Sequence, residues 1–216
     1  MAIYLKKHKL TYISVPKVAC TSLKNYFFEV ENGFAFRSFR LNGKRYGIHQ
    51  FAQSPKFSKI KPGMMAGHRK ITVVRDPWRR ILSCYASKVV ARKTLHQVEF
   101  TPEQKKLGMV TDPSLDNFVD LLQHYRTASF EIRHHTRPLS FFLGEDPDFY
   151  DRIFSINQLQ QMIEYVATIV PDAPELQHLN KKTADKVDPS QAEIDRNRPL
   201  IEAAYAQDTE IFGTFM

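Results

Sequence analysis

The sequence predicts an α/β fold in which helices flank a central parallel β-sheet. Two strand–turn–helix units, over residues 11–30 and 71–89, carry this prediction. A second unit of the same kind in one chain is typical of parallel sheets. The length of 216 residues and the 43% of hydrophobic residues supply enough apolar surface for a full core. We therefore expect residues 1–216 to form a single domain.

The first unit begins with a strand whose β-branched and aromatic residues favour an extended backbone. Pro16 ends this strand, because proline cannot donate to a β-ladder. Thr21 or Ser22 is the expected N-cap of the following helix. Backbone N–H groups converge at a helix start, where the dipole favours negative charge, and Lys17 adds a full positive charge. The turn is therefore a candidate anion site, with an ordinary connection carrying a surface lysine as the alternative.

The second unit is a strand of β-branched residues that runs into Asp76 and Pro77. Asp76 suits the N-cap of a helix, and Pro77 suits its first turn. Apolar residues then recur at helical spacing as far as residue 89. We expect Arg79 and Arg80, on this helix, to be surface charges, with the alternative that one of them packs against the sheet.

The rest of the chain is less regular. Asn-Gly between alternating apolar residues predicts a β-hairpin within residues 34–48, and the alternative is an irregular loop that carries phenylalanines into the core. The polar stretch 94–112 is expected to be either a mobile flap, as in many substrate lids, or a partly helical insertion. Residues 126–143 are expected to be rich in loops. Further helices are expected within residues 50–60, 114–125, 159–170 and 189–208, and a third strand over residues 150–156.

The formal net charge of +8 indicates an anionic ligand. The basic residues form separate clusters, unlike the single run of a nucleic-acid tail, so we expect no nucleic-acid partner. Cys20 and Cys84 do not suggest a disulfide framework, which agrees with a reducing compartment. The sequence shows neither a signal peptide nor an apolar run of about 18 residues. We expect no membrane segment and a bacterial cytoplasmic location, with a trimmed Golgi-lumenal domain as the alternative.

Two anion-binding turns at the carboxyl ends of parallel strands suit a ligand with two separated phosphate-like groups. A P-loop kinase would need G-x-x-x-x-G-K-[ST], but residues 16–22 read PKVACTS. Both glycines are absent, and the lysine precedes the turn. These differences argue against a small-metabolite kinase, which remains an alternative function alongside a basic nucleic-acid-binding protein and a degenerate cofactor-binding module.

The chain contains three segments, VPKVACTS, VVRDPWRRILSCY and HLNKKTADKVDPSQ, which in this order resemble the carbohydrate sulfotransferases. These enzymes use 3′-phosphoadenosine 5′-phosphosulfate (PAPS), and the resemblance is closest to the heparan/uronyl 2-O-sulfotransferase branch. It implies a P-loop-like sulfotransferase fold and transfer of a sulfonyl group to a hydroxyl of a carbohydrate-type acceptor, with adenosine 3′,5′-bisphosphate (PAP) as the product. The resemblance places the cofactor core at about residues 11–30, 68–92 and 150–186, and the acceptor or lid regions at about 34–60 and 94–143.

The resemblance also implies roles for single residues. Lys17 matches the lysine that contacts the bridging and sulfonyl oxygens, and Arg75 and Ser83 match the pair that holds the 3′-phosphate. The spacing of Arg75 and Ser83 agrees with this, because side chains on a helix lean back toward its start. The other implied cofactor residues are Val18, Ala19, Cys20, Thr21 and Ser22 at the 5′ site and Lys181, Lys182 and Thr183 in a closing loop.

Sulfonyl transfer needs a base, and histidine suits that task. In the resembling family the catalytic histidine lies well before the second motif, and His49, 26 residues before Arg75, matches that place. His68 is the second choice, and His134 or His135 are further alternatives. The histidines lack a ligand pattern, so no metal is expected.

The sequence leaves the contacts of the acceptor open. Basic residues could line an acidic glycan groove or simply be solvated, and aromatic residues could stack on sugar rings or belong to the core. The candidates are Lys93, Arg126, Arg133 and Arg137 for the groove and Tyr46, Phe51 and Tyr125 for stacking.

Overall fold

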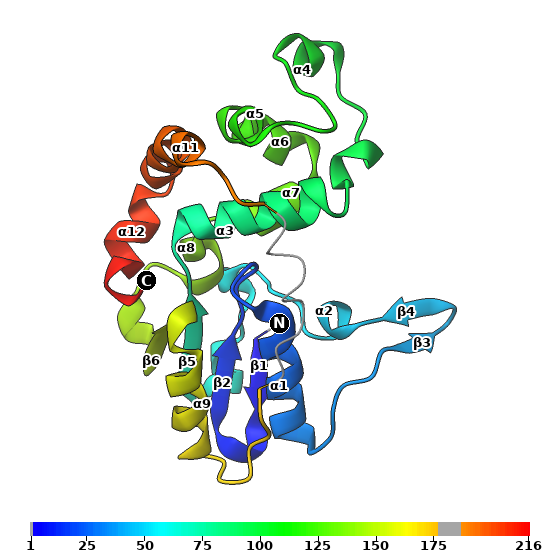
Figure 1. Ribbon diagram of the computed structural model, residues 1–216. Coiled ribbons are helices and arrows are strands. Elements are labelled where there is room, and N and C mark those ends of the chain that lie inside the picture. The colour runs from blue at the N-terminus through cyan, green and yellow to red at the C-terminus, as the bar shows by residue number, and fades with distance from the viewer. Residues whose placement is uncertain (1, 177–186) are drawn as a thin grey trace. The chain divides into compact units, whose positions relative to one another are not determined.

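The computed structural model describes residues 2–176 and 187–216, and the chain divides into two compact units (Figure 1). We call the first the sheet unit and the second the helical unit. Each unit is built from segments that are distant in the sequence. The sheet unit comprises Met1–Arg75, Leu139–Leu179 and Ile211–Met216, and the helical unit comprises Asp76–Pro138 and Asn180–Glu210.

A four-stranded sheet with the order β1-β2-β5-β6 forms the centre of the sheet unit. Strands β2, β5 and β6 are parallel, which confirms the predicted parallel sheet. Strand β1 pairs with β2 in the antiparallel sense and adds an edge that the sequence did not indicate. All four residues of β2 are buried, as expected for a central strand. The strands are β1 (Ile3–Leu5), β2 (Leu10–Ile13), β5 (Arg69–Val74) and β6 (Arg152–Ser155).

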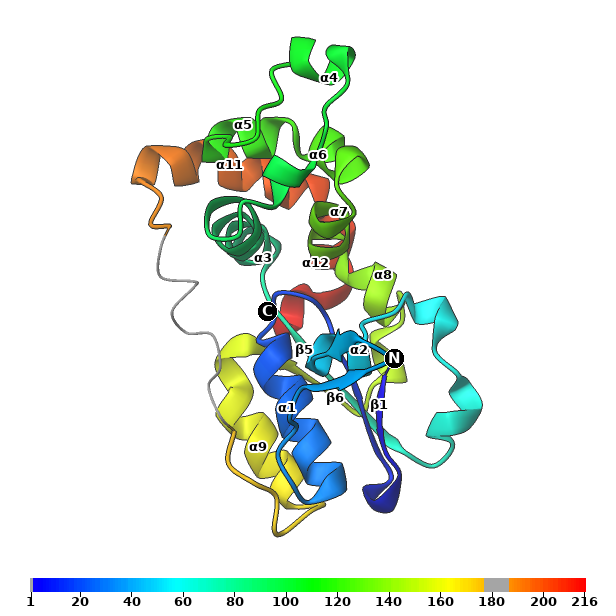
Figure 2. The same cartoon turned by 90° about the vertical axis from the view of Figure 1, so that its right-hand side faces the viewer.

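Helices α1 (Cys20–Asn32) and α9 (Leu159–Ala167) lie on the same side of this sheet (Figure 2). The ring of Tyr12 in β2 stacks on Phe27 of α1 with centroids 4.5 Å apart, which ties strand to helix across the core. Helix α1 begins at Cys20, and its N-cap is Ala19 without a side-chain hydrogen bond. The expected N-cap, Thr21 or Ser22, is therefore wrong, because both residues lie inside the first turn.

The predicted β-hairpin is present and consists of β3 (Phe39–Leu41) and β4 (Lys44–Tyr46). Asn42 and Gly43 have φ angles of 50° and 73°, the two positive values that the tight turn of a hairpin requires. The alternative, phenylalanines carried into the core, is wrong, because Phe34 and Phe39 are 62% and 44% exposed. A one-turn helix, α2 (Ile48–Phe51), follows the hairpin.

The helical unit has its own apolar core, centred on Trp78, Phe118 and Tyr125. Asp76 caps α3 as predicted, since its carboxylate accepts a hydrogen bond from the N–H of Arg79. Helix α3 continues as a π-helical turn through residues 85–90. The helices of this unit are α3 (Pro77–Cys84), α4 (Pro102–Lys106), α5 (Leu115–Asp120), α6 (Leu122–Ala128), α7 (Phe130–Thr136) and α11 (Gln191–Ala204), while α12 (Ala206–Phe212) runs into the sheet unit.

Residues 126–143 are largely helical, so the prediction of a loop-rich stretch is wrong. They contain the end of α6, all of α7 and, in the sheet unit, α8 (Leu139–Leu143). The hydroxyl of Ser129 accepts from the N–H of Ile132 and caps α7, while Ile132 itself is fully buried. The helices are short and separately capped, and for this reason the sequence shows no long helical period.

Arg80 is 1% exposed, which makes the prediction of a surface charge wrong for this residue. Its guanidinium lies 3.8 Å from the carboxylate of Asp208 and donates a 2.7 Å hydrogen bond to the carbonyl of Arg137. Burial lowers the pKa of Arg80, while Asp208 opposes this effect. The buried pair therefore ties α3 to the residues that follow α11 in the chain.

Candidate active site

The loop between β2 and α1 has an unusual backbone. Lys17 and Ala19 have φ angles of 69° and 54°, on either side of Val18, which is not among the residues with positive φ. Alternating signs of φ turn successive N–H groups toward one side and form a concavity that binds anions. Left-handed residues other than glycine cost about 1 kcal/mol each, so such a loop is typical of a functional site. Pro16 and Val18 are buried and anchor the loop.

The start of α1 extends this concavity. The first described bond of the helical ladder runs from the N–H of Leu23 to the carbonyl of Ala19, 3.1 Å away. The N–H groups of Cys20, Thr21 and Ser22 precede that bond, at the positive end of the helix dipole. Backbone donors of the loop and the helix start therefore converge on one place, which suits a phosphate or sulfate group.

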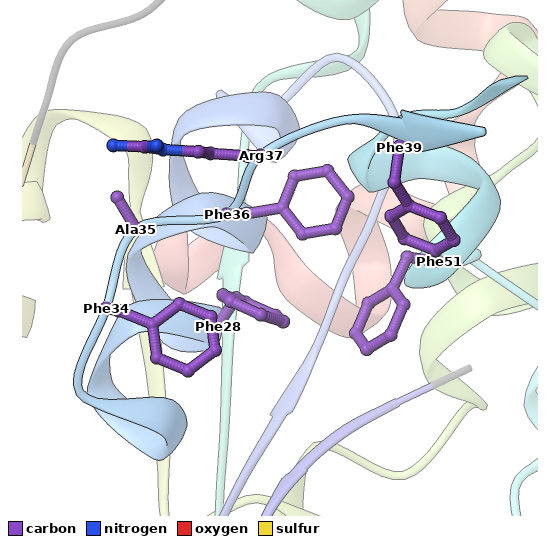
Figure 3. A pocket seen from close by; sticks show the side chains of 7 residues that line it. All are labelled: Phe28, Phe34, Ala35, Phe36, Arg37, Phe39 and Phe51. Atoms are coloured by element: carbon purple, nitrogen blue, oxygen red, sulfur yellow. The ribbon is translucent and has the colours of Figure 1, made fainter.

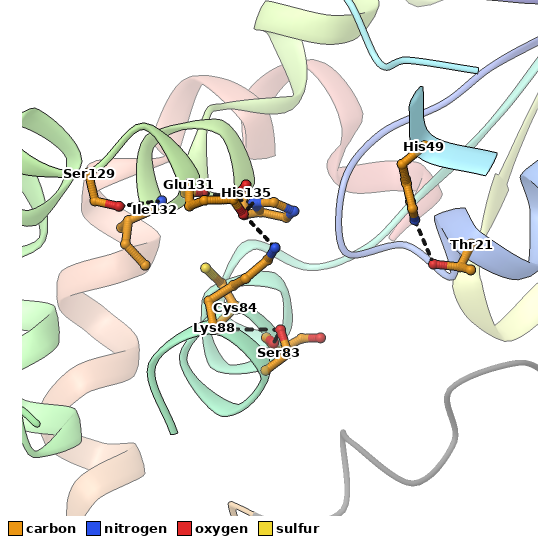
Figure 4. Close-up of polar contacts among 10 residues, drawn as sticks. Thr21, His49, Ser83, Cys84, Lys88, Ser129, Glu131, Ile132 and His135 are labelled. Atoms are coloured by element: carbon orange, nitrogen blue, oxygen red, sulfur yellow. Dashed lines mark hydrogen bonds and ion pairs between the residues drawn. The ribbon is translucent and has the colours of Figure 1, made fainter. Parts of the chain in front are cut away.

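His49 lies on α2 and points at the start of α1 (Figure 4). Its Nε2 lies 2.9 Å from the hydroxyl of Thr21, and its Nδ1 lies 3.4 Å from Nζ of Lys24. Thr21, which the sequence suggested as a helix cap or phosphate donor, therefore contacts the predicted catalytic histidine. The imidazole is exposed, so a substrate hydroxyl can reach it.

Lys24 is a site residue that sequence reasoning missed. Its side chain is 2% exposed, and burial lowers the pKa of its ammonium group, with Cys20 acting in the opposite sense. A lysine three residues after a candidate phosphate-binding threonine lies on the same face of a helix. That spacing was visible in the sequence, but the contact with His49 depends on a segment 25 residues away.

Arg75 lies directly after β5 and donates a 3.3 Å hydrogen bond to the carbonyl of Lys17. Strands β2 and β5 are parallel neighbours, so the segments that follow them meet at one edge of the sheet. The structure thus brings the first and second sequence motifs together through Lys17 and Arg75. The side chain of Arg75 supports the backbone of the candidate anion loop.

His68, the second choice as base, precedes β5 and lies at the other end of this strand. Its Nδ1 is 2.9 Å from the hydroxyl of the buried Thr11. A six-residue strand is about 20 Å long, so His68 is far from the loop that follows β2. Its position favours a structural role.

The other predicted site residues lie elsewhere in the chain. Ser83 belongs to the helical unit, is half-buried on α3, and its carbonyl accepts a 2.8 Å hydrogen bond from the hydroxyl of Ser87. In the same unit His135 lies near Glu131 and Lys88 (Figure 4). Lys181, Lys182 and Thr183 lie outside the described residues. Tyr125, a candidate for sugar stacking, is fully buried and belongs to the core of the helical unit.

Two further features concern metals and membranes. Within residues 2–176 and 187–216, no three His, Cys, Asp or Glu side chains gather into a possible metal site. Among the helices that the structure describes, none combines the length and the apolar character needed to cross a bilayer. Among the described residues, Cys20 and Cys84 do not form a disulfide.

Residues 1–213 match the model of the sulfotransferase family. The chain belongs to the sulfotransferase family. This confirms the family-level resemblance of the three sequence segments, and the parallel sheet agrees with the P-loop-like sulfotransferase fold. No curated protein and no solved structure gives a significant match to this sulfotransferase.

Proposed function

We propose that this sulfotransferase moves the sulfonyl group of PAPS to a hydroxyl of a carbohydrate-type acceptor by in-line displacement, and that it works in a bacterial cytoplasm. The observation that carries the proposal is the contact between His49 and Thr21. This contact places a candidate base at the start of α1. The loop of residues 16–19 before this helix has alternating signs of φ, a geometry that suits an anion. Cys20 and Cys84 are not joined in a disulfide, which agrees with a reducing compartment.

The loop of residues 16–19 and the start of α1 would hold the 5′-phosphosulfate. The backbone geometry fits this group, because several N–H donors converge there without an acidic side chain among residues 14–22. Lys17 would neutralise the charge that grows on the phosphate oxygen as its bond to sulfur breaks. Arg75 and Ser83 would hold the 3′-phosphate, and arginine suits this task because its planar fork binds two phosphate oxygens.

His49 would accept the proton of the acceptor hydroxyl at Nε2 while the acceptor oxygen bonds to sulfur. Nζ of Lys24 lies 3.4 Å from Nδ1 of His49 and would orient the imidazole so that Nε2 faces the acceptor hydroxyl. The acceptor hydroxyl would then take the place of the Thr21 hydroxyl at Nε2. Lys24 is thus a positioning residue that acts through His49.

Thermal unfolding with different nucleotides tests the donor. A ligand at 100 times its Kd that binds only the folded state stabilises it by about 2.7 kcal/mol, so PAP is expected to raise the Tm clearly more than ATP does. A larger shift with ATP and Mg²⁺ would favour a kinase instead. Salt-sensitive binding of an oligonucleotide, without any preference for PAP, would favour a nucleic-acid-binding protein.

A variant of the candidate base tests the chemistry. His49→Ala is expected to keep the PAP-induced rise in Tm and to lose transfer of labelled sulfonyl from PAPS. His68→Ala is the matched control and is expected to keep both. Full activity of His49→Ala would rule this histidine out as the base.

A further inference from the structure

The sheet unit has a pocket of about 470 Å³ beside α1 and α2, at the base of the hairpin (Figure 3). Its lining is almost entirely aromatic. The rings of Phe28, Phe36 and Phe51 contact one another with centroids 5.1–5.7 Å apart. Phe34 and Phe39 extend this group, and Arg37 also lines the pocket.

These rings are exposed to an extent that is uncommon for phenylalanine. Phe34 is 62% exposed, Phe51 is 49% exposed and Phe39 is 44% exposed. Fully burying an exposed phenylalanine gains roughly 1.5–3 kcal/mol, so leaving about half of each ring in water forgoes roughly half of that gain. Contiguous exposed apolar surface usually marks a binding site. An aromatic pocket with one charged group is the common composition of a small-molecule site.

The pocket and the candidate base are linked through α2. His49 contacts Thr21 of α1, and two residues later Phe51 contacts Phe28 of the same helix. Thr21 and Phe28 are seven residues apart, which puts them on one face of α1 and about 10 Å apart along its axis. A molecule of moderate length can therefore present a hydroxyl to His49 while another part of it occupies the pocket.

The chemistry of the lining selects the part that binds there. The phenylalanine side chains offer no hydrogen bonds, so sugar hydroxyls buried against them would lose their water without a partner. An aryl ring or alkyl chain has no such penalty. The surrounding chain is strongly basic: residues 32–75 contain ten Lys and Arg and no Asp or Glu. Four of these basic residues, Arg37, Arg40, Lys44 and Arg45, lie on and beside the hairpin and are exposed.

We propose that the aromatic pocket binds an apolar group, an aryl ring or an alkyl chain, of an acceptor that also carries negative charge. This inference rests on the proposed function and narrows its acceptor to an amphipathic, anionic glycoconjugate. The apolar part occupies the phenylalanine pocket, the charge faces Arg37 and the hairpin arginines, and the hydroxyl reaches His49.

Binding can be tested without donor or turnover by titration with 8-anilinonaphthalene-1-sulfonate, a fluorescent probe with an aryl group and a negative charge. We expect saturable binding whose Kd rises at least tenfold in Phe34→Ala and in Phe51→Ala. Phe130→Ala, which removes a phenylalanine that is 66% exposed in the helical unit, is the matched control and is expected to change the Kd less than twofold. Unchanged Kd values in both pocket variants would overturn the proposal.

Competition with glycosides tests the kind of acceptor. p-Nitrophenyl β-D-glucuronide is expected to displace the probe at a concentration at which methyl β-D-glucuronide does not. Arg37→Gln is expected to weaken the p-nitrophenyl glucuronide and to leave the uncharged p-nitrophenyl glucoside unchanged. Equal displacement by the methyl and aryl glycosides would contradict an apolar subsite.

Two controls separate this inference from the proposed function and from a lipid surface. Phe51→Ala is expected to weaken the probe and to keep the PAP-induced rise in Tm, because the pocket and the nucleotide site are separate. If PAP does not raise the Tm of the wild type, the proposed function is contradicted, while the probe result still stands. Wild-type protein is expected not to sediment with phosphatidylglycerol vesicles. Sedimentation that Phe34→Ala abolishes would assign the pocket to a membrane surface and overturn the acceptor proposal.

Discussion

The hydroxyl of Thr21 lies 2.9 Å from Nε2 of His49, although 28 residues separate them in the chain. This contact joins the candidate phosphate-binding motif to the candidate base. Lys24 lies against the other ring nitrogen, so the imidazole is held between two side chains of one helix. Lys24 and Thr21 therefore both contribute to the orientation of the His49 ring.

Substitution of Lys24 tests this arrangement. Lys24→Gln supplies a carbonyl that accepts from Nδ1–H, so it is expected to retain transfer within about tenfold of the wild type and to make the rate less dependent on pH. Lys24→Met offers no comparable acceptor, and we expect its kcat to fall more than tenfold. The pH profiles of both variants, with PAP binding as the control, check the prediction. Equal activities of the two would argue against a positioning role.

The same lysine predicts how stability depends on pH. Burial lowers the pKa of Lys24 below its ordinary value of 10.5, so in the window between the two values the unfolded chain binds more protons. The free energy of unfolding therefore rises with pH in this window. Lys24→Met is expected to remove this rise and to stabilise the fold at pH 7 by on the order of 1 kcal/mol.

Urea unfolding at pH 7.0 and 9.5 measures this effect. Tyrosines of the unfolded chain begin to ionise near the higher pH, whereas burial raises the pKa of Tyr26 to about 12, so this group lowers stability there in both proteins. The effect of Lys24 is therefore the difference between the wild type and Lys24→Met. A wild-type stability that does not rise relative to that of Lys24→Met, or a less stable Lys24→Met at pH 7, would contradict the assigned cost of the buried ammonium.

Arg75 is predicted to recognise the 3′-phosphate. Arg75→Ala should then weaken PAP by about 10- to 100-fold, as expected for the loss of a charge-assisted hydrogen bond, and should change the affinity for 5′-AMP much less. Calorimetric titration with both nucleotides gives the comparison. Equal losses for PAP and 5′-AMP would instead mean that Arg75 acts through the loop by its bond to the carbonyl of Lys17.

Ser83 is predicted to share this phosphate. Ser83→Ala should weaken PAP by about 10- to 100-fold and leave 5′-AMP unaffected, as expected for the loss of one hydrogen bond to a charged group. Ser87→Ala is the matched control on the following turn. If Ser87→Ala weakened PAP selectively and Ser83→Ala did not, the 3′-phosphate contact would belong to Ser87 and the prediction for Ser83 would be wrong.

The Arg80–Asp208 pair is predicted to be essential for the stability of the helical unit. Asp208→Ala leaves a buried charge without its counterion and is expected to cost about 3–5 kcal/mol, whereas the double variant Arg80→Met with Asp208→Leu should recover most of this loss. Glu202→Ala, which removes the exposed pair with Arg198, should change stability by at most about 0.5 kcal/mol. Denaturant unfolding measures all three.

The sequence by itself determined the parts that depend on local chemistry. β-Branched runs predicted β2 and β5, Asn42-Gly43 predicted the hairpin turn, and Asp76 predicted the start of α3. The motif around Lys17 predicted a turn between β2 and α1, and two of its residues, Lys17 and Ala19, have positive φ. Each of these signals acts over a few residues, because strand propensity, turn geometry and helix capping are properties of neighbouring groups.

Only the tertiary structure decided what depends on distant segments. Residues 25 or more positions apart are joined in the burial of Arg80 against Asp208 and in the contacts of Lys24 and Thr21 with His49. The antiparallel pairing of β1 with β2 joins closer residues, but it also had no signal in the sequence. The exposed phenylalanine pocket is a further case, since the same residues suit a core equally well. Composition measures how apolar a residue is, but the packing of the whole chain decides whether it meets protein or water.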